Sequence, residues 1–78
     1  MSMKYPLPGD TYCHYKGGTY EIISMATHTE TNEKLVVYKS INFGSVYVRP
    51  FDIFIDKVEI SDEFDNKIII NRFDKIIL

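Results

Sequence analysis

The amino-acid sequence predicts a small, mainly β protein whose strands form an antiparallel barrel. Segments 20–27, 35–39 and 46–49 are dense in β-branched and aromatic residues, the composition that suits a pleated, half-buried surface. Each of the two connecting segments carries a turn signal. Residues 27–33 offer short side chains whose oxygens can accept hydrogen bonds from turn amides, and residues 41–44 contain an asparagine and a glycine, which can supply the positive φ of a tight hairpin. The three runs therefore predict a meander of consecutive antiparallel strands.

Length and charge limit what such a meander can do. The chain has 78 residues, which is room for one domain with one core, and a chain of this size buries roughly 60 to 65% of its unfolded surface. We expect a single domain over residues 1–78, with the barrel at 11–60 and a C-terminal extension at 61–78. The formal charge of −2 argues against broad binding to phosphate backbones, which depends on clustered Lys and Arg.

The cellular location is predicted from cysteine content and hydropathy. Cys13 is the single cysteine, so no internal disulfide can form, and the N-terminal MSMKYPLPGD has no apolar run that could act as a signal peptide. Apolar runs stay well below the roughly 18 residues that cross a bilayer, because charges interrupt residues 53–60 and 68–78. We expect a cytoplasmic protein with no membrane contact.

The first third of the chain predicts a lead-in and a hairpin. Two prolines and a glycine within residues 1–10 favour an extended segment and a turn. Residues 11–16 form the first strand, ended by the strong hairpin signal Gly17-Gly18. Simple alternation along residues 20–28 places one set of side chains on one face of the sheet: Tyr20, Ile22, Ser24, Ala26 and His28.

The rest of the chain predicts a short helical turn and further strands. Pro50 suits the first position of one turn of 3₁₀ helix, with Asp52 favourably placed near its N-terminus. Residues 55–60 alternate as a half-exposed fifth strand of the barrel. Residues 67–71 and 72–78 are apolar enough to be strand additions or a docked tail, and for 73–78 strand and helix both stay open. The expected core is Tyr20, Ile22, Ala26, Leu35, Val37, Val46 and Val48.

The candidate site is a polar cluster of His28, Glu30, Tyr47 and Arg49, interpreted as binding a ligand or partner. Tyr47 and Arg49 share a strand face, so that strand presents an aromatic ring beside a guanidinium. A structural interpretation competes with this one. In it His28 is a buried imidazole, Glu30 accepts turn amides, and the fork of Arg49 pairs with a carboxylate of the turn, Glu30 or Glu33. In a three-strand meander this turn and the end of the third strand lie at the same edge.

Catalytic and metal chemistry find little support. Cys13 with His28 as nucleophile and base would still need an orienting group and an oxyanion site. A zinc site from Cys13, His14 and His28 would need the adjacent Cys13 and His14 to face the same way, which strand alternation opposes. We therefore predict no catalytic residue, no metal site and no cofactor.

Residues along the middle of the chain carry a family resemblance: His14-Tyr15-Lys16-Gly17-Gly18, Tyr20, Ala26-Thr27-His28-Thr29-Glu30-Thr31, Glu33, Leu35-Val36-Val37-Tyr38, Val48-Arg49-Pro50 and Phe54. In this combination the chain resembles domain-of-unknown-function family 1653 over most of residues 12–58, and Arg72-Phe73 matches an Arg-Phe often found near the family's end. The resemblance implies a short, mostly bacterial protein with a small SH3-like barrel and no established activity. Residues 62–71 replace the family's usual glycine-containing stretch before that Arg-Phe.

Three hypotheses of function remain. The favoured one is a non-catalytic binding module that presents an aromatic and arginine surface to a peptide or protein. Binding of single-stranded nucleic acid is suggested by aromatics interleaved with Lys16, Lys39 and Arg49, and weakened by the acidic balance. A small hydrolytic or ligand-modifying enzyme would use His28 and Glu30, although so short a chain offers little wall to exclude water.

Overall fold

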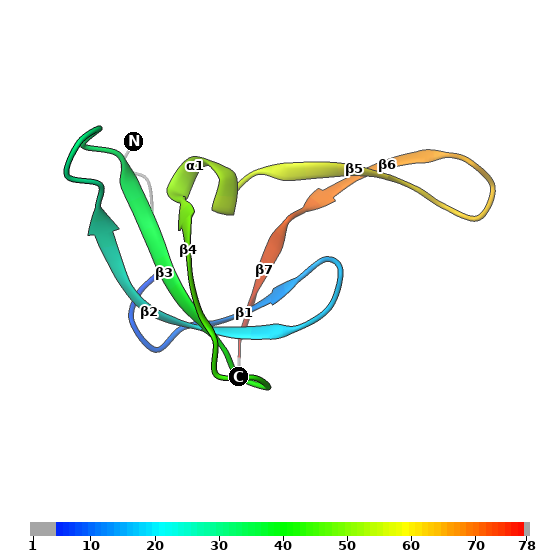
Figure 1. Cartoon of the computed structure of the whole chain (residues 1–78). Helices are drawn as coiled ribbons and strands as arrows, with labels where there is room; N and C mark the ends of the chain where they lie inside the picture. The colour runs from blue at the N-terminus through cyan, green and yellow to red at the C-terminus, as the bar shows by residue number, and fades with distance from the viewer. Residues whose placement is uncertain (1–4, 78) are drawn as a thin grey trace.

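A computed structural model describes residues 5–77, in which the strands form a five-stranded antiparallel sheet and a separate two-stranded hairpin (Figure 1). The elements in chain order are β1 (Thr11–His14), β2 (Thr19–Thr27), β3 (Lys34–Ser40), β4 (Val46–Pro50), α1 (Phe51–Phe54), β5 (Lys57–Ser61), β6 (Lys67–Asn71) and β7 (Phe73–Ile76). The sheet order is β4-β3-β2-β1-β7, and β5 pairs with β6. The mainly β, antiparallel prediction is confirmed. Within residues 5–77 the edge strands β4 and β7 do not pair, so no closed barrel is found.

A β-bulge in β2 changes which side chains face the core. The pairing of β2 with β3 shifts between Ile22, which lies opposite Tyr38, and Ser24, which lies opposite Val37. One extra residue moves every later side chain of the strand to the other face. The simple alternation expected for residues 20–28 is therefore wrong beyond Ile22, and Met25 packs against the core.

The core differs from the expected set because of this bulge and because β3 uses its other apolar face. The buried hydrophobic residues are Ile22, Val36, Tyr38, Phe51, Phe54 and Phe73, with Tyr20 partly buried against them. Val46 and Val48 are 57% and 56% exposed, and Val37 is half-buried on the opposite face of β3 from Val36. Of the predicted core, Ile22 is confirmed as buried and Tyr20 lies at its margin. Ala26 and Leu35 are half-buried. The rest of the core is supplied by Val36 and Tyr38 of β3 and by three phenylalanines of α1 and β7.

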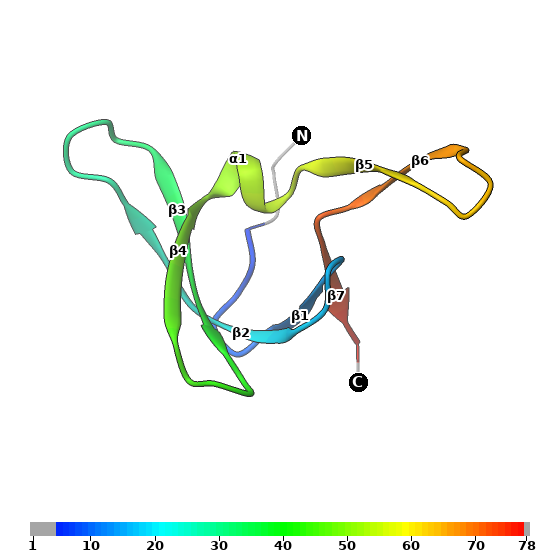
Figure 2. The same cartoon turned by 45° about the vertical axis from the view of Figure 1, so that its right-hand side comes forward.

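The chain after Pro50 forms one turn of helix rather than the expected 3₁₀ turn, because the Ile55 amide donates to the Phe51 carbonyl four residues earlier (3.1 Å). No helix in the described part of the chain is long and apolar enough to cross a membrane. The β5–β6 hairpin then projects away from the sheet (Figure 2). Its turn closes locally, since Asp62 Oδ1 accepts the amides of Phe64 and Asn66 at 2.9 and 2.8 Å.

The fifth strand of the sheet is β7, which pairs with β1. The expectation that residues 55–60 supply this strand is wrong, because β5 lies in the hairpin. Of the two possibilities for residues 73–78, strand is confirmed over Phe73–Ile76. The hairpin thus returns the chain so that a segment within the expected C-terminal extension completes the sheet.

We predict that Val36→Ala lowers the free energy of unfolding by about 2 kcal/mol, because Val36 is fully buried and the substitution leaves a cavity. Val37→Ala is the matched control, since the same side chain is half-buried on the opposite face, and it should cost less than about 1 kcal/mol. Urea unfolding followed by circular dichroism measures both. Equal costs for the two variants would contradict the assignment of faces in β3.

Candidate binding pocket

A pocket of ≈ 270 Å³ opens against the core on the inner face of the curled sheet. All five strands of the sheet contribute to its lining, which is His14, Tyr20, Tyr38, Tyr47, Arg49 and Phe73. The sheet register explains why these side chains meet. Tyr38 lies opposite Tyr47, and His14 lies opposite Phe73, and residues opposite each other in an antiparallel pair project to the same side.

The aromatic lining forms edge-to-face contacts. The ring centroids of Tyr20 and Tyr38 are 5.4 Å apart with an interplanar angle of 85°, and those of Tyr38 and Phe73 are 5.5 Å apart at 73°. This geometry is favourable for aromatic quadrupoles and fixes the rings. Gly18 in the β1–β2 turn has φ +92°, and a Cβ there would lie 3.0 Å from the Tyr20 hydroxyl oxygen. Gly18 therefore provides the positive φ of the turn and also leaves room for the Tyr20 ring at the pocket wall.

Arg49 supplies the permanent charge of the pocket. Its guanidinium carbon lies 5.5 Å from the centroid of the Phe73 ring, a cation–π arrangement. Its Nη1 is buried and has no hydrogen-bond partner among the described residues. The predicted pairing of Arg49 with Glu30 or Glu33 is wrong, because the ion pairs found within residues 5–77 do not include this side chain.

His14 lies at the pocket as a neutral ring. Its Nδ1 accepts the amide of Lys16 at 3.1 Å, so the neutral tautomer carries its proton on Nε2. Burial lowers the pKa of His14, and the positive charges of Arg49, Arg72 and Lys16 lower it further. Among residues 5–77 no carboxylate lines the pocket, so its electrostatic character is positive although the whole chain carries a charge of −2.

Tyr38 provides a hydroxyl in the same pocket. Burial raises the pKa of Tyr38, and Arg49 offsets part of that rise, both through its positive charge and through a hydrogen bond that its side chain donates to the phenol oxygen. The phenol is therefore protonated at neutral pH and can donate a hydrogen bond.

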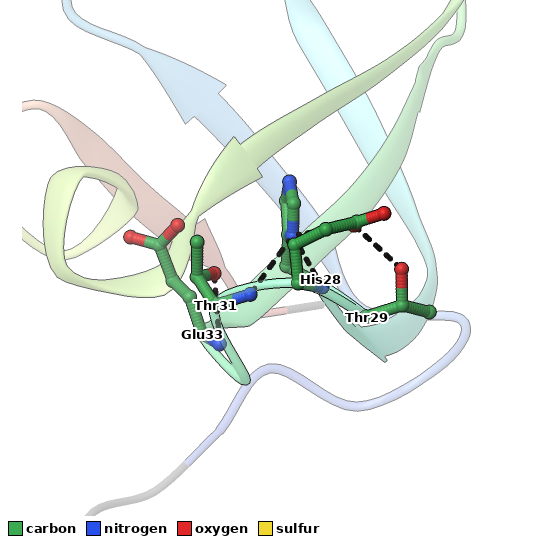
Figure 3. A network of polar contacts seen from close by, with 5 residues as sticks. His28, Thr29, Thr31 and Glu33 are labelled. Carbon is green, nitrogen blue, oxygen red and sulfur yellow. Dashed lines mark hydrogen bonds and ion pairs between the residues drawn. The ribbon is translucent and has the colours of Figure 1, made fainter.

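His28 and Glu30 lie elsewhere, in the turn between β2 and β3. Figure 3 shows His28 with its neighbours in this turn. His28 Nδ1 accepts the amides of Glu30 and Thr31 at 3.2 and 3.3 Å. An unprotonated Nδ1 has no hydrogen to share with the Glu30 carboxylate 3.3 Å away. That carboxylate instead accepts the hydroxyl of Thr29 at 2.6 Å. The imidazole thus acts as a turn cap.

The structure brings together two of the four predicted site residues. Tyr47 and Arg49 line the pocket, whereas His28 and Glu30 do not. Sequence reasoning missed four lining residues, which are His14, Tyr20, Tyr38 and Phe73. The signal for Tyr38 was available, because a tight turn at residues 41–44 places it opposite Tyr47. The sequence around Phe73 did not indicate that this residue lines the pocket, since its strand pairs with β1, which is far away in the sequence.

A comparison with known families matches residues 10–75 to the family described as "Protein of unknown function (DUF1653)". This range contains every residue that lines the pocket. No curated protein and no solved structure gives a significant match.

We predict that in an NMR pH titration His14 titrates below the ordinary value of 6.5. Arg49→Gln should raise the pKa of His14 only part of the way, because burial is the larger cause. Lys39→Gln removes a charge on the exposed side of β3 and should leave it unchanged. The unfolded chain binds more protons than the folded chain between the two pKa values of His14, so this residue makes stability fall as pH drops below 6.5. A His14 pKa at or above 6.5 would contradict the description of the pocket.

Proposed function

The chain belongs to the DUF1653 family of proteins of unknown function, and from its pocket we propose that it is a non-catalytic module that binds an extended peptide segment of a protein partner. The observation that carries the proposal is the aromatic pocket with Arg49, two of whose lining residues come from the edge strand β4. The SH3-like architecture and the cytoplasmic location expected from the sequence belong to the same proposal.

The outer edge of β4 offers backbone groups to another strand. At the β3–β4 turn the Ser40 amide donates to the Ser45 carbonyl at 2.8 Å. Hydrogen-bonded and non-hydrogen-bonded pairs alternate in an antiparallel ladder, so the backbone groups of Val46 and Val48 are directed away from β3. In the described part of the chain β3 is the single strand paired with β4. An extended peptide can therefore add to this edge, as in other β-augmentation complexes.

Such an added strand would place a side chain at the pocket. Side chains of a strand alternate between the two faces of a sheet, so every second residue of the peptide projects on the face that carries Tyr47 and Arg49. Backbone pairing then provides affinity and the pocket provides selectivity. Tyr47 is 45% exposed, which leaves its ring accessible to an incoming group.

Catalysis is less well supported than binding. His28 and Glu30 are outside the pocket, and the Nδ1 atoms of both histidines already accept backbone amides. Cys13 precedes His14 in β1 and therefore projects to the opposite face. Single-stranded nucleic acid remains the second candidate, since the Tyr and Phe rings could stack on a base. With one arginine lining the pocket, however, the phosphate-binding contribution would be small.

We predict that selection from a random peptide display library against the intact chain enriches peptides that bind in an extended form. Tyr47→Ala should weaken binding of the enriched peptides by about tenfold or more, because an aromatic wall is lost. Val48→Ala lies on the same strand but on the opposite face and is the matched control. Failure to enrich any peptide, or equal binding by Tyr47→Ala, would contradict the proposal. Tighter binding of a short oligothymidine strand than of any peptide would favour the nucleic-acid alternative.

A second prediction concerns the edge itself. Val48→Pro removes an amide directed away from β3, and proline is tolerated on edge strands, so the chain should stay folded while peptide affinity falls. In the wild-type chain, the amides of Val46 and Val48 should gain protection from hydrogen exchange when the peptide binds. Unchanged exchange at both amides in a saturated complex would show that the peptide does not add to β4.

A further inference from the structure

We infer that the group accepted by the pocket is a carboxylate, held by the guanidinium of Arg49. The inference rests on the proposed function, which supplies the peptide that bears the group. An aspartate or glutamate side chain and a free C-terminus share this chemistry, and the experiment below separates them.

The first argument is the state of Arg49. A buried charged donor without a partner is costly unless a bound group supplies the acceptor. The ring of Phe73, whose centroid lies 5.5 Å from the guanidinium carbon, offers the cation a π face but no oxygen that could accept its N–H groups. Nη1 has no partner among the described residues. A carboxylate can accept two parallel N–H bonds from this fork.

The second argument is the electrostatic surroundings. The charges that act on His14 are all positive, from Arg49, Arg72 and Lys16. Arg72 already has an acid, since its Nη2 lies 3.7 Å from Asp56 Oδ2. Arg49 has none within the described residues. A local positive field in a chain of net charge −2 is complementary to a single negative group rather than to a polyanion.

The third argument is the rest of the lining. The protonated hydroxyl of Tyr38 can donate a hydrogen bond to a carboxylate oxygen. The rings of Tyr20, Tyr38 and Tyr47 form apolar walls around the polar end, and ≈ 270 Å³ is room for a small acid. A cation would meet Arg49 without a counter-charge, because no carboxylate of the described residues lines the pocket.

To test the inference, the ¹⁵N-labelled intact chain is titrated in NMR experiments with sodium benzoate, benzamide and benzylammonium. All three probes contain a benzene ring, and they differ in the charge of the attached group. Benzoate should shift the amide resonances around His14, Tyr47 and Phe73, and benzamide should bind at least about tenfold more weakly. Benzylammonium should not bind. Arg49→Gln should abolish the preference for benzoate, and Arg49→Lys should keep part of it because the charge remains. Lys39→Gln removes one positive charge outside the pocket and should leave the preference intact.

Peptides enriched in the display experiment identify the source of the carboxylate. Loss of affinity on changing one acidic residue to its amide assigns a side chain, and loss on amidating the C-terminus assigns the terminal group. Equal binding of benzoate and benzamide, or a benzoate preference that survives in folded Arg49→Gln, overturns the inference. If Arg49→Gln does not fold, Arg49→Lys and the comparison of the three probes on the wild-type chain decide.

The proposal of peptide binding and the inference of a carboxylate site can be contradicted independently. If enriched peptides bind equally well after their acidic side chains are changed to amides and after their C-terminus is amidated, this result supports the peptide-binding function. The same result contradicts the inference that the pocket binds a carboxylate. A benzoate preference that depends on Arg49, with no peptide enriched, keeps the carboxylate site and removes the peptide-binding function.

Discussion

The stacking of Phe54 on Phe73 is the contact on which the rest of the structure depends. The two ring centroids are 4.1 Å apart and the rings are nearly parallel, at 11°. Phe54 belongs to α1, which follows the edge strand β4, and Phe73 begins β7 at the other edge of the sheet. The stack therefore joins the two ends of the curled sheet by side chains where no backbone ladder joins them in the described residues. Hydrophobic burial takes the role that hydrogen bonds have in a closed barrel.

The same phenylalanine links the core to the pocket. One part of the Phe73 ring packs on Phe54, while its surroundings also include Arg49, His14 and Tyr38. A substitution at Phe73 would lower stability and change the pocket together, so it could not separate the two roles. Tyr47 and Arg49 are better probes because neither belongs to the buried cluster, and both lie on a strand whose outer edge is unpaired in the described residues.

Much of the fold could be predicted from local sequence, and the errors have identifiable physical causes. The strands up to Pro50 and their turns follow from β-branched runs and turn residues, and they are confirmed. The core face was mispredicted because the bulge after Ile22 has no marker in the sequence and because Val36 and Val37 are equally apolar. The place of β7 depends on pairing with a strand about sixty residues earlier, which local patterns do not report.

The candidate site, like the fold, could be predicted from the sequence only in part. The shared face of Tyr47 and Arg49 follows from period-two alternation and is found in the structure. The partner of Arg49 could not be predicted, because it depends on which face of β4 is turned inward and on Phe73 arriving from the end of the chain. The turn histidine was recognised as polar and ordered, but its hydrogen bonds hold its own turn.

The difference between the expected and the observed environment of Arg49 bears directly on function. A pair with Glu30, whose side chain is 78% exposed, would have been a surface ion pair of little energetic value, and it would have neutralised the guanidinium. In the structure the side chain instead turns inward to an aromatic ring, with Nη1 unpartnered. Arg72, whose charge also acts on His14, is paired with Asp56, although its Nε is buried without a partner. Among the described residues Arg49 is therefore the one of these two arginines that has no carboxylate. The proposed recognition of an acidic group depends on the unpartnered Nη1, which a pair with Glu30 would have occupied.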